Sequence, residues 1–387
     1  MNLREPIAIT ALSSISSLGN TTKVVWNAYL NNDHYLHKIK TRKETLWAGV
    51  ISEDIKNRLE ALRTSDAKYQ KLDNTVIYSI ATAREAIAQA GWENGDIFGI
   101  NIGSSRGATT LFEKYHQEFL EQDESSTLAS PTTTLGNISS WVSHDLGSKG
   151  PQISHSITCS TALHSILNGV AWLQSGMSNK FLVGGSEAAV TPFTIAQMQA
   201  LKVYSKLDGE YPSRALDFKK RQNTMVLGEG AAMVCLETDK PNNTLATIIG
   251  VGYATELLQH NVSISADARC FQHSMKMALG QYSSKTVNAI VMHAPGTVKG
   301  DKAEYSAIEK VFGERLPFLT TNKWKMGHTF GASGMLSLEL AVLMLQYQVG
   351  ISTPFYLNES IPTQFDRIMV NAVGFGGNAV SILLERP

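Results

Sequence analysis

Strand-like and helix-like segments alternate along almost the whole chain, and this alternation restricts the fold more than any other feature. The segment 6–15 is rich in the apolar and β-branched residues that form strands. A helix is predicted over 74–90, between an N-cap at Asp73 and a stop at Gly91. A short apolar strand follows at 97–102. Alternation of this kind is typical of the α/β class.

The second half of the chain repeats the order of elements in the first half. In the first half, a short strand leads to Cys159, a helix follows, and the strand 181–183 closes on a glycine pair. In the second half, the strand 318–321 leads past His328 into a helix, and the strand 367–373 closes on a glycine-rich turn. Halves built alike bring corresponding segments to a common seam. We therefore expect Cys159 and His328 to be neighbours in space.

The boundary between the halves is predicted at the polar turn 239–243, which separates two strand-like runs. This gives an N-terminal half at 1–240 and a C-terminal half at 241–387. The Ser/Thr-rich segment 121–137, which contains Pro131, is predicted to be a long surface or interface loop.

Charge and cysteine content exclude several classes of protein. Thirty-four basic residues balance 34 acidic ones, so no basic surface favours a nucleic acid partner. Charged residues make up 18% of the chain, below the usual level of about a quarter, and 43% are hydrophobic. A chain with this composition buries a large core and has apolar surface left for an interface. Three widely spaced cysteines indicate a reducing compartment rather than a disulfide scaffold.

No segment reads as a membrane anchor. The N-terminal segment contains Glu5 and Pro6, where a signal peptide has an unbroken apolar run. The most apolar stretch, 335–349, contains Glu339 and is shorter than the about 20 residues that cross a bilayer. We expect a soluble, cytoplasmic protein that has no membrane partner.

Cys159 is the candidate nucleophile. Apolar residues line one face of the run that follows it, which places the cysteine at a helix N-terminus. Free N–H groups and the helix dipole favour an anion there and lower the pKa of a thiol. The alternative is an inert buried cysteine, as we predict for Cys235 and Cys270.

His328 is the second candidate, because the small residues around it suit an imidazole held in a tight pocket. The alternative is a helix-capping histidine. Lys323, five residues earlier, is placed to orient or polarise it. His164, one and a half turns after Cys159, is expected to be buried and hydrogen-bonded rather than to act as a base. The glycine pair at 184–185 either contacts a ligand through its N–H groups or permits close packing.

Seven segments together resemble the ordered signature blocks of the β-ketoacyl-[acyl carrier protein] synthases. They read TCSTALHSI, LVGGSEA, SRALD, GEGAA, HAPGTVKGDKAE, NKWKMGHTFGASG and VGFGGNAV. These enzymes catalyse condensation in fatty acid and polyketide synthesis and have the thiolase fold. The resemblance covers essentially the whole chain. It implies two similar βα halves that form a layered α-β-α-β-α core, and it implies an acyl carrier protein as partner, with no cofactor and no metal.

The resemblance also assigns roles to residues. Cys159 corresponds to the cysteine that takes the growing acyl chain as a thioester, and His328 to the second of two histidines that assist decarboxylation of malonyl-carrier protein. Lys323 corresponds to the lysine that supports the histidines. The remaining correspondences are the acidic positions Asp301 and Glu304, the oxyanion-hole N–H groups of Cys159 and Phe375, and the gating turn Phe375–Gly376.

The first catalytic histidine of that family is absent here. The family block Asn-Ala-His-Gly-Thr reads HAPGT at 293–297, so Pro295 stands in the place of the histidine. Loss of one such donor costs about 10²–10³ in rate. His293 lies two positions earlier, on the same face of a strand but about 6.5 Å away, and whether it compensates is left open. Ser337 stands where many members carry a glutamate, and the segment 297–300 is two residues shorter than theirs.

Two functions follow from these departures. The first is a chain-length-factor-like partner of an active ketosynthase in a heterodimer, for which we suggest aryl polyene synthesis. The alternative is an autonomous, homodimeric synthase that condenses through Cys159 with an incomplete histidine pair. A binding protein without activity is the least supported class. The resemblance implies that either dimer forms through the strand at about 152–158.

Overall fold

The computed structural model describes the whole chain except residues 1, 42, 94 and 258–263. The strands are β1 (Asn2–Ser16), β2 (His37–Lys40), β3 (Thr45–Ala48), β4 (Gly99–Gly103), β5 (Gln152–Ile153), β6 (Lys180–Glu187), β7 (Gly230–Glu237), β8 (Ala246–Thr255), β9 (Ala289–Val291), β10 (Phe318–Thr320), β11 (Arg367–Gly374) and β12 (Asn378–Glu385). The helices are α1 (Thr22–Leu30), α2 (Glu53–Thr64), α3 (Asn74–Ala90), α4 (Thr109–Gln122), α5 (Ala129–Thr133), α6 (Asn137–Leu146), α7 (Thr161–Gln174), α8 (Pro192–Ala200), α9 (Arg269–Leu279), α10 (Val298–Phe312), α11 (Lys323–Met326) and α12 (Ser333–Tyr347). Single-turn helices at Thr158–Ser160 and Phe330–Ala332 precede α7 and α12.

The main sheet contains the predicted repeat. Its order is β10-β9-β11-β12-β8-β1-β7-β6-β4-β5. From the central β8–β1 pair outward, the first half runs β1-β7-β6-β4-β5 and the second runs β8-β12-β11-β9-β10. In each half the first two pairings are antiparallel and the outer two are parallel. The same chain order therefore produces the same topology twice.

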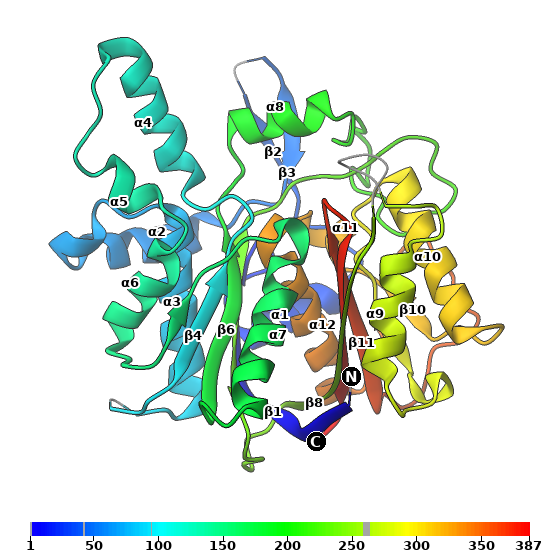
Figure 1. Cartoon of the computed structure of the whole chain (residues 1–387). Coiled ribbons are helices and arrows are strands. Elements are labelled where there is room, and N and C mark those ends of the chain that lie inside the picture. Colours follow the sequence, from blue (N-terminus) through cyan, green and yellow to red (C-terminus); the bar gives the residue numbers. More distant parts are fainter. Residues whose placement is uncertain (1, 42, 94, 258–263) are drawn as a thin grey trace.

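The helices form layers on and between the two halves of the sheet. Helices α7 and α12 pack against each other and against strands of both halves, while α3 lies on β1, β6 and β7 and α9 on β8 and β12 (Figure 1). Three large apolar clusters fill the spaces between these layers. This arrangement confirms the α-β-α-β-α thiolase fold expected from the sequence.

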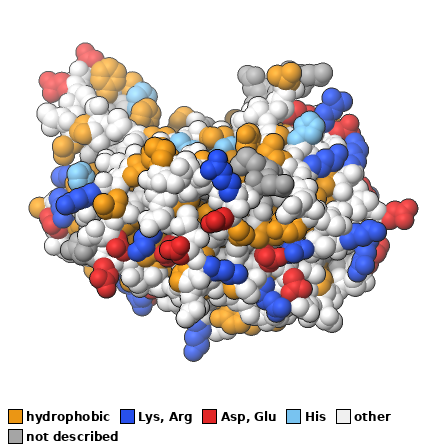
Figure 2. Space-filling model, turned by 60° about the horizontal axis from the view of Figure 1, so that its bottom comes forward, with side chains coloured by type: hydrophobic (Ala, Val, Ile, Leu, Met, Phe, Trp, Pro, Cys, Tyr) orange, Lys and Arg blue, Asp and Glu red, His pale blue; other side chains and the backbone are white. Residues whose placement is uncertain are grey.

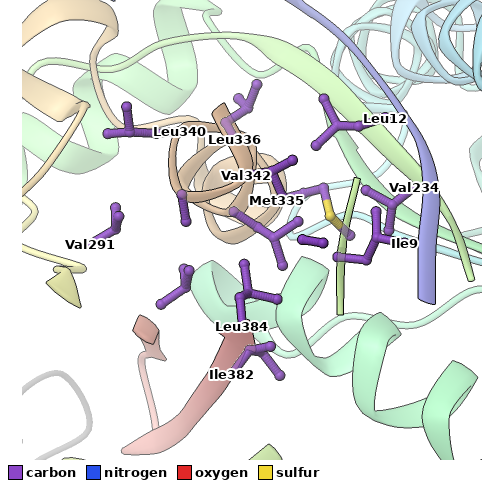
Figure 3. Packing of buried hydrophobic residues seen from close by; sticks show 14 of the residues in the cluster. Ile9, Leu12, Val234, Val291, Met335, Leu336, Leu340, Val342, Ile382 and Leu384 are labelled. Atoms are coloured by element: carbon purple, nitrogen blue, oxygen red, sulfur yellow. The ribbon is translucent and has the colours of Figure 1, made fainter. Parts of the chain in front are cut away.

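Helix α12 is the central element of the core. Every residue from Ser333 to Leu345 is buried. Figure 3 shows its side chains Met335, Leu336, Leu340 and Val342 among apolar residues from strands of both halves. Together with the preceding single turn, it forms an 18-residue run, Phe330–Tyr347, that is long and apolar enough to cross a membrane. This run starts earlier than the expected stretch 335–349 and is long enough by composition, but 89% of it is buried inside the protein, as in a core helix.

Local predictions agree with the structure where capping residues mark the ends. Helix α3 spans Asn74–Ala90, with the Asp73 side chain accepting from the Thr75 N–H and Gly91 in the left-handed conformation. The prediction of one long loop over 121–137 was wrong. The segment contains the end of α4, the short helix α5 and the first residue of α6. In a loop, hydroxyl groups would accept hydrogen bonds from nearby N–H groups. Here the hydroxyls of Thr132 and Thr133 donate to carbonyls one turn earlier, a hydrogen bond that is compatible with a helix.

The surface agrees with the balanced charge count. Figure 2 shows a face on which basic and acidic side chains are interspersed rather than gathered by sign. This face provides no extended basic patch of the kind that binds nucleic acid.

Glu339 is a buried charge in the middle of α12 and generates a prediction about stability. It is 2% exposed, its Oε1 accepts from the Ser14 hydroxyl at 2.5 Å, and its Oε2 has no partner among the described residues. Burial raises the pKa of this carboxyl from 4.5 to about 7. The native state therefore holds a proton that the unfolded state releases between about pH 4.5 and 7, and the folded state loses stability across that range.

We expect Glu339→Gln to stabilise the protein at pH 8, on the order of 3 kcal/mol, and to have little effect near pH 4.5. The amide keeps the acceptor for Ser14 and removes the buried charge. Denaturant unfolding at the two pH values measures this. Glu85→Gln is the control, because Glu85 lines the same small cavity but is exposed. Equal effects of Glu339→Gln at both pH values would contradict the prediction.

Candidate active site

Cys159 lies in the single-turn helix between β5 and α7, and Thr161 fixes the chain there. The Thr161 hydroxyl accepts from the Ile157 N–H at 2.9 Å and donates to the Thr158 carbonyl at 2.6 Å. Thr158 has a φ of +49°, which is strained for a β-branched residue. A strained turn directly before a buried helix fixes the backbone there. It therefore gives the next side chain, that of Cys159, one defined position. Cys159 thus occupies an elbow at the start of α7, as expected.

The ionisation of Cys159 differs from the sequence-based expectation. Burial raises the pKa of the thiol to about 12, and the charge of Glu187 adds to this effect. Lys323 and Arg106 oppose it without reversing it. The prediction of a lowered pKa was therefore wrong, because desolvation by burial outweighs the helix N-terminus. At neutral pH this site presents a thiol, so acylation requires a base to remove its proton.

Glu187, at the end of β6, is a site residue that the sequence reasoning missed. It is fully buried, and its two oxygens accept four hydrogen bonds. These come from the Ser104 hydroxyl (2.9 Å) and the N–H groups of Ser105 (2.8 Å), Arg106 (3.1 Å) and Gly331 (2.9 Å). One carboxylate therefore joins the loop after β4 to the turn that precedes α12. The available signal was an acidic residue at the end of an apolar strand, two positions after a glycine pair.

Gly185 decides between the two interpretations of the glycine pair, in favour of close packing. A Cβ at this position would lie 2.8 Å from the Gly331 carbonyl oxygen and 2.8 Å from the Ala162 Cβ. The turn Phe330–Ala332 and the start of α7 therefore meet on the same glycine of β6. This contact brings the segments that carry Cys159 and His328 together, as the repeat predicted.

His328 is held by its backbone and leaves its ring available. Its N–H donates to the Val226 carbonyl at 2.7 Å, and its carbonyl accepts from the Gly228 N–H at 3.0 Å. The residue is 2% exposed, and its Nδ1 has no partner in the described part of the chain. Burial and the charge of Lys323 lower its pKa to about 3, so the imidazole is neutral. These contacts disfavour the alternative of a helix-capping histidine.

Lys323 begins α11 and is buried beside the histidines. Its Nζ donates to the Ser337 hydroxyl at 3.4 Å, a long contact with a neutral group. Burial lowers its pKa to about 8, against the opposing charges of Glu304 and Asp301. The ammonium is thus the main positive charge near the candidate nucleophile, and its partner at position 337 carries no charge.

Two carboxylates of α10 accept hydrogen bonds from the backbone of the segment that contains Pro295. Glu304 accepts from the N–H groups of His293 (3.0 Å) and Ala294 (2.9 Å). Asp301 accepts from the Gly296 N–H at 3.0 Å and forms a buried ion pair with Lys220 at 2.6 Å. Asp301 and Glu304 therefore act on the backbone of this segment, not on a ligand.

His293 points into the site. Its ring centroid lies 5.3 Å from that of His328, with the two planes nearly perpendicular. The residue is 5% exposed and its Nδ1 also has no partner among the described residues. Burial, then the charges of Lys323 and His328, keep its pKa well below the usual value. Pro295, in contrast, is half-buried, and its ring faces Gly300 at the start of α10.

The turn between β11 and β12 completes the site. A Cβ on Gly374 would lie 1.9 Å from the Thr158 hydroxyl and 3.2 Å from the Cys159 nitrogen, so this turn rests on the elbow. The Phe375 carbonyl accepts from Thr158 at 3.4 Å, and its side chain is 38% exposed. Gly376 follows with a φ of +95°. The turn that carries Phe375 therefore lies directly against the elbow that carries Cys159.

Two remaining expectations concern His164 and metals. His164 Nδ1 lies 3.1 Å from the Ser160 carbonyl oxygen, which agrees with a hydrogen-bonded role, but the residue is half-buried rather than buried. Across the residues that the structure describes, no group of three or more His, Cys, Asp and Glu side chains is arranged to hold a metal ion.

Comparison with known proteins gives relatives of matching length. The chain is 28% identical to the 3-oxoacyl-[acyl-carrier-protein] synthase 2 of Coxiella burnetii, over 98% of both chains. It is 26% identical to the enzyme of that name from Vibrio cholerae, over 98% of this chain and 99% of the other.

Solved structures with the same fold include ketosynthase complexes. One is a type II polyketide acyl carrier protein with its ketosynthase (AntDE:AntF), with a TM-score of 0.86 and 20% identity over 99% of this chain and 100% of the other. Another is the ketosynthase ApeO with its chain length factor ApeC from Xenorhabdus doucetiae, with a TM-score of 0.78 and 20% identity over 99% and 98%.

Two family models account for most of the chain. The N-terminal domain of the β-ketoacyl synthases matches residues 4–242, and the C-terminal domain matches residues 245–354. The protein therefore belongs to the β-ketoacyl synthase family, whose members elongate fatty acid and polyketide chains.

Proposed function

We propose that this chain is a chain-length-factor-like subunit that pairs with an active ketosynthase, in a cytoplasmic system that builds carrier-protein-bound acyl chains. The observation that carries the proposal is Pro295. Its ring has no donor and packs toward α10, so the position that the family uses for its first histidine presents no hydrogen bond to a substrate. Aryl polyene synthesis is the pathway that we suggest for this pair.

Two further features support a weakened condensing site. Ser337 gives Lys323 a neutral contact at 3.4 Å where many family members have a glutamate. The Cys159 thiol, with a pKa of about 12, also needs a strong base, while burial and Lys323 make His328 a weak one. Both features slow acylation more than they affect the shape of the pocket.

The alternative is an autonomous synthase, and one observation favours it. Cys159, the turn at Phe375 and the pair His293–His328 form a connected site rather than a degraded one. A homodimer would suffice for that function. The outer strand β5 is an edge of the sheet with part-exposed residues, and it suits pairing with either a second copy or a ketosynthase.

The composition of the native complex tests the proposal most directly. We expect native mass spectrometry of the complex isolated from the source cells to show one copy of this chain and one of a different ketosynthase. Recovery of a homodimer alone would refute the partner role.

Cys159→Ala should leave most chain elongation intact in the reconstituted complex. The growing chain would be carried by the cysteine of the partner, while this subunit forms part of the acyl tunnel. Product analysis from malonyl-carrier protein measures the effect, and the matched Cys→Ala change in the partner should abolish elongation. If Cys159→Ala also abolishes elongation in a folded complex, the chain is itself a condensing enzyme.

Cys159 should be the thiol that iodoacetamide labels first. It is 7% exposed, against 0% for Cys235 and 1% for Cys270. Because the pKa of Cys159 is raised to about 12, labelling should be slow at pH 7 and accelerate toward pH 9. Peptide mass mapping of the native protein measures the order, and Cys159→Ala gives the background. Earlier labelling of Cys235 or Cys270 would contradict this assignment.

A further inference from the structure

We propose that a small monovalent anion, of the size of formate or chloride, binds beside Lys323 and Ser337. The anion serves as the counter-ion of a buried ammonium to which the described part of the chain supplies no ion pair. This site goes beyond the proposed function, because it depends on this chain alone and not on the identity of a partner.

The first argument is the small number of acceptors around Lys323. The residue is 2% exposed, and an ammonium has three N–H donors. Within the described part of the chain, its Nζ has one acceptor, the Ser337 hydroxyl at 3.4 Å. That hydroxyl is neutral and itself donates to the side-chain oxygen of Asn322 at 3.4 Å. A buried positive charge therefore has one distant, uncharged partner.

The second lysine of α11 shows how the same protein satisfies a buried ammonium. Lys325 is 0% exposed, and its Nζ donates to the carbonyl oxygens of Asn31 and Asp33, both at 2.7 Å, and to the Asn31 side-chain oxygen at 3.2 Å. Burial lowers the pKa of both lysines to about 8, so both are mostly protonated at pH 7. The two ammonium groups carry the same charge, but only Lys325 has an acceptor for each of its donors.

The third argument concerns the carboxylates nearest to Lys323. Glu304 and Asp301 act on it through their charge but are engaged elsewhere. Glu304 accepts from two backbone N–H groups, and burial raises its pKa to about 7, so at pH 7 it carries only part of its charge. Asp301 pairs with Lys220 at 2.6 Å. Because a buried charge without a close partner is costly, an anion from solution that reaches Lys323 stabilises the folded state.

The surroundings provide further donors for an anion. The Thr321 hydroxyl and Nδ1 of both His293 and His328 are buried and have no partner among the described residues. The charge of Lys323 acts on both rings. A hydroxyl and a neutral imidazole can each donate a hydrogen bond to an anion.

The residue at 337 sets the size of the anion. A serine side chain and a formate ion together have as many non-hydrogen atoms as a glutamate side chain, the residue that many family members carry at this position. Formate therefore matches in size, and chloride in charge, the carboxylate that Ser337 lacks.

Thermal unfolding of the purified full-length chain at pH 7 tests the proposal. Sodium formate and sodium chloride are each compared with sodium gluconate, whose anion is much larger, at one ionic strength. We expect about 200 mM formate or chloride to raise Tm by about 2 °C relative to gluconate. Ser337→Glu supplies the carboxylate from the chain and should remove this difference. Ser125→Glu adds the same charge at an exposed serine and should preserve it.

A crystal grown in sodium bromide locates the anion independently. We expect an anomalous peak within hydrogen-bond distance of Lys323 Nζ in the unchanged chain and none there in Ser337→Glu. An effect of either formate or chloride supports the site, and the larger effect identifies whether it takes carboxylates or halides.

Three outcomes would overturn the proposal. Equal Tm values in formate, chloride and gluconate would leave water as the partner of the ammonium. The same difference between salts in Ser337→Glu, or bromide at surface positions only, would place the anion elsewhere. If Ser337→Glu does not fold, Ser337→Asp decides by the same measurements. None of these results depends on the composition of the native complex, so failure here and failure of the partner role are distinguishable.

Discussion

The site depends on buried carboxylates that accept backbone N–H groups from irregular loops. Glu187 holds the loop after β4 and the turn before α12, and Glu304 holds the segment 293–294. Burial raises the pKa of both carboxyls to about 7, in spite of these hydrogen bonds. A charge or partial charge in the core is costly unless several donors surround it. The loops are therefore coupled to the carboxylates, and neither can rearrange alone.

Burial away from water strengthens the hydrogen bonds of these carboxylates. It also shifts the pKa values of the other groups at the site. The same burial that raises the pKa of Glu187 raises that of Cys159 and lowers those of His328 and Lys323. Burial thus favours the neutral forms of these groups. Lys323, with a pKa of about 8, still stays mostly protonated at pH 7, and in surroundings of low dielectric its positive charge acts over a longer distance than in water. A negative charge that develops on a substrate is the natural partner for it.

The sequence predicted those features that local signals specify. Helix α3 was found because Asp73 and Gly91 mark its ends, and the two-fold repeat of the sheet because both halves order their elements alike. Glu187 was missed because its four donors come from segments far apart in the chain. The pKa of Cys159 was misjudged because the sequence shows a helix N-terminus but not how completely later segments cover it. The direction of His293 was left open because the positive φ of Ala294 has no sequence signal.

The residues at 295 and 337 change two different properties of the site. One affects the hydrogen-bond donors beside His328, and the other affects the charge beside Lys323. Proline at 295 removes one donor, and the twist at Ala294 brings another histidine to His328 instead. Serine at 337 removes a carboxylate from Lys323, whose remaining acidic neighbours, Glu304 and Asp301, are already engaged by backbone N–H groups. With less of its field neutralised locally, the ammonium acts more strongly on the space beside the two rings. The Cys159 thiol, whose pKa is raised, therefore lies near a weak base, His328, and a buried ammonium whose nearest hydrogen-bond partner is neutral.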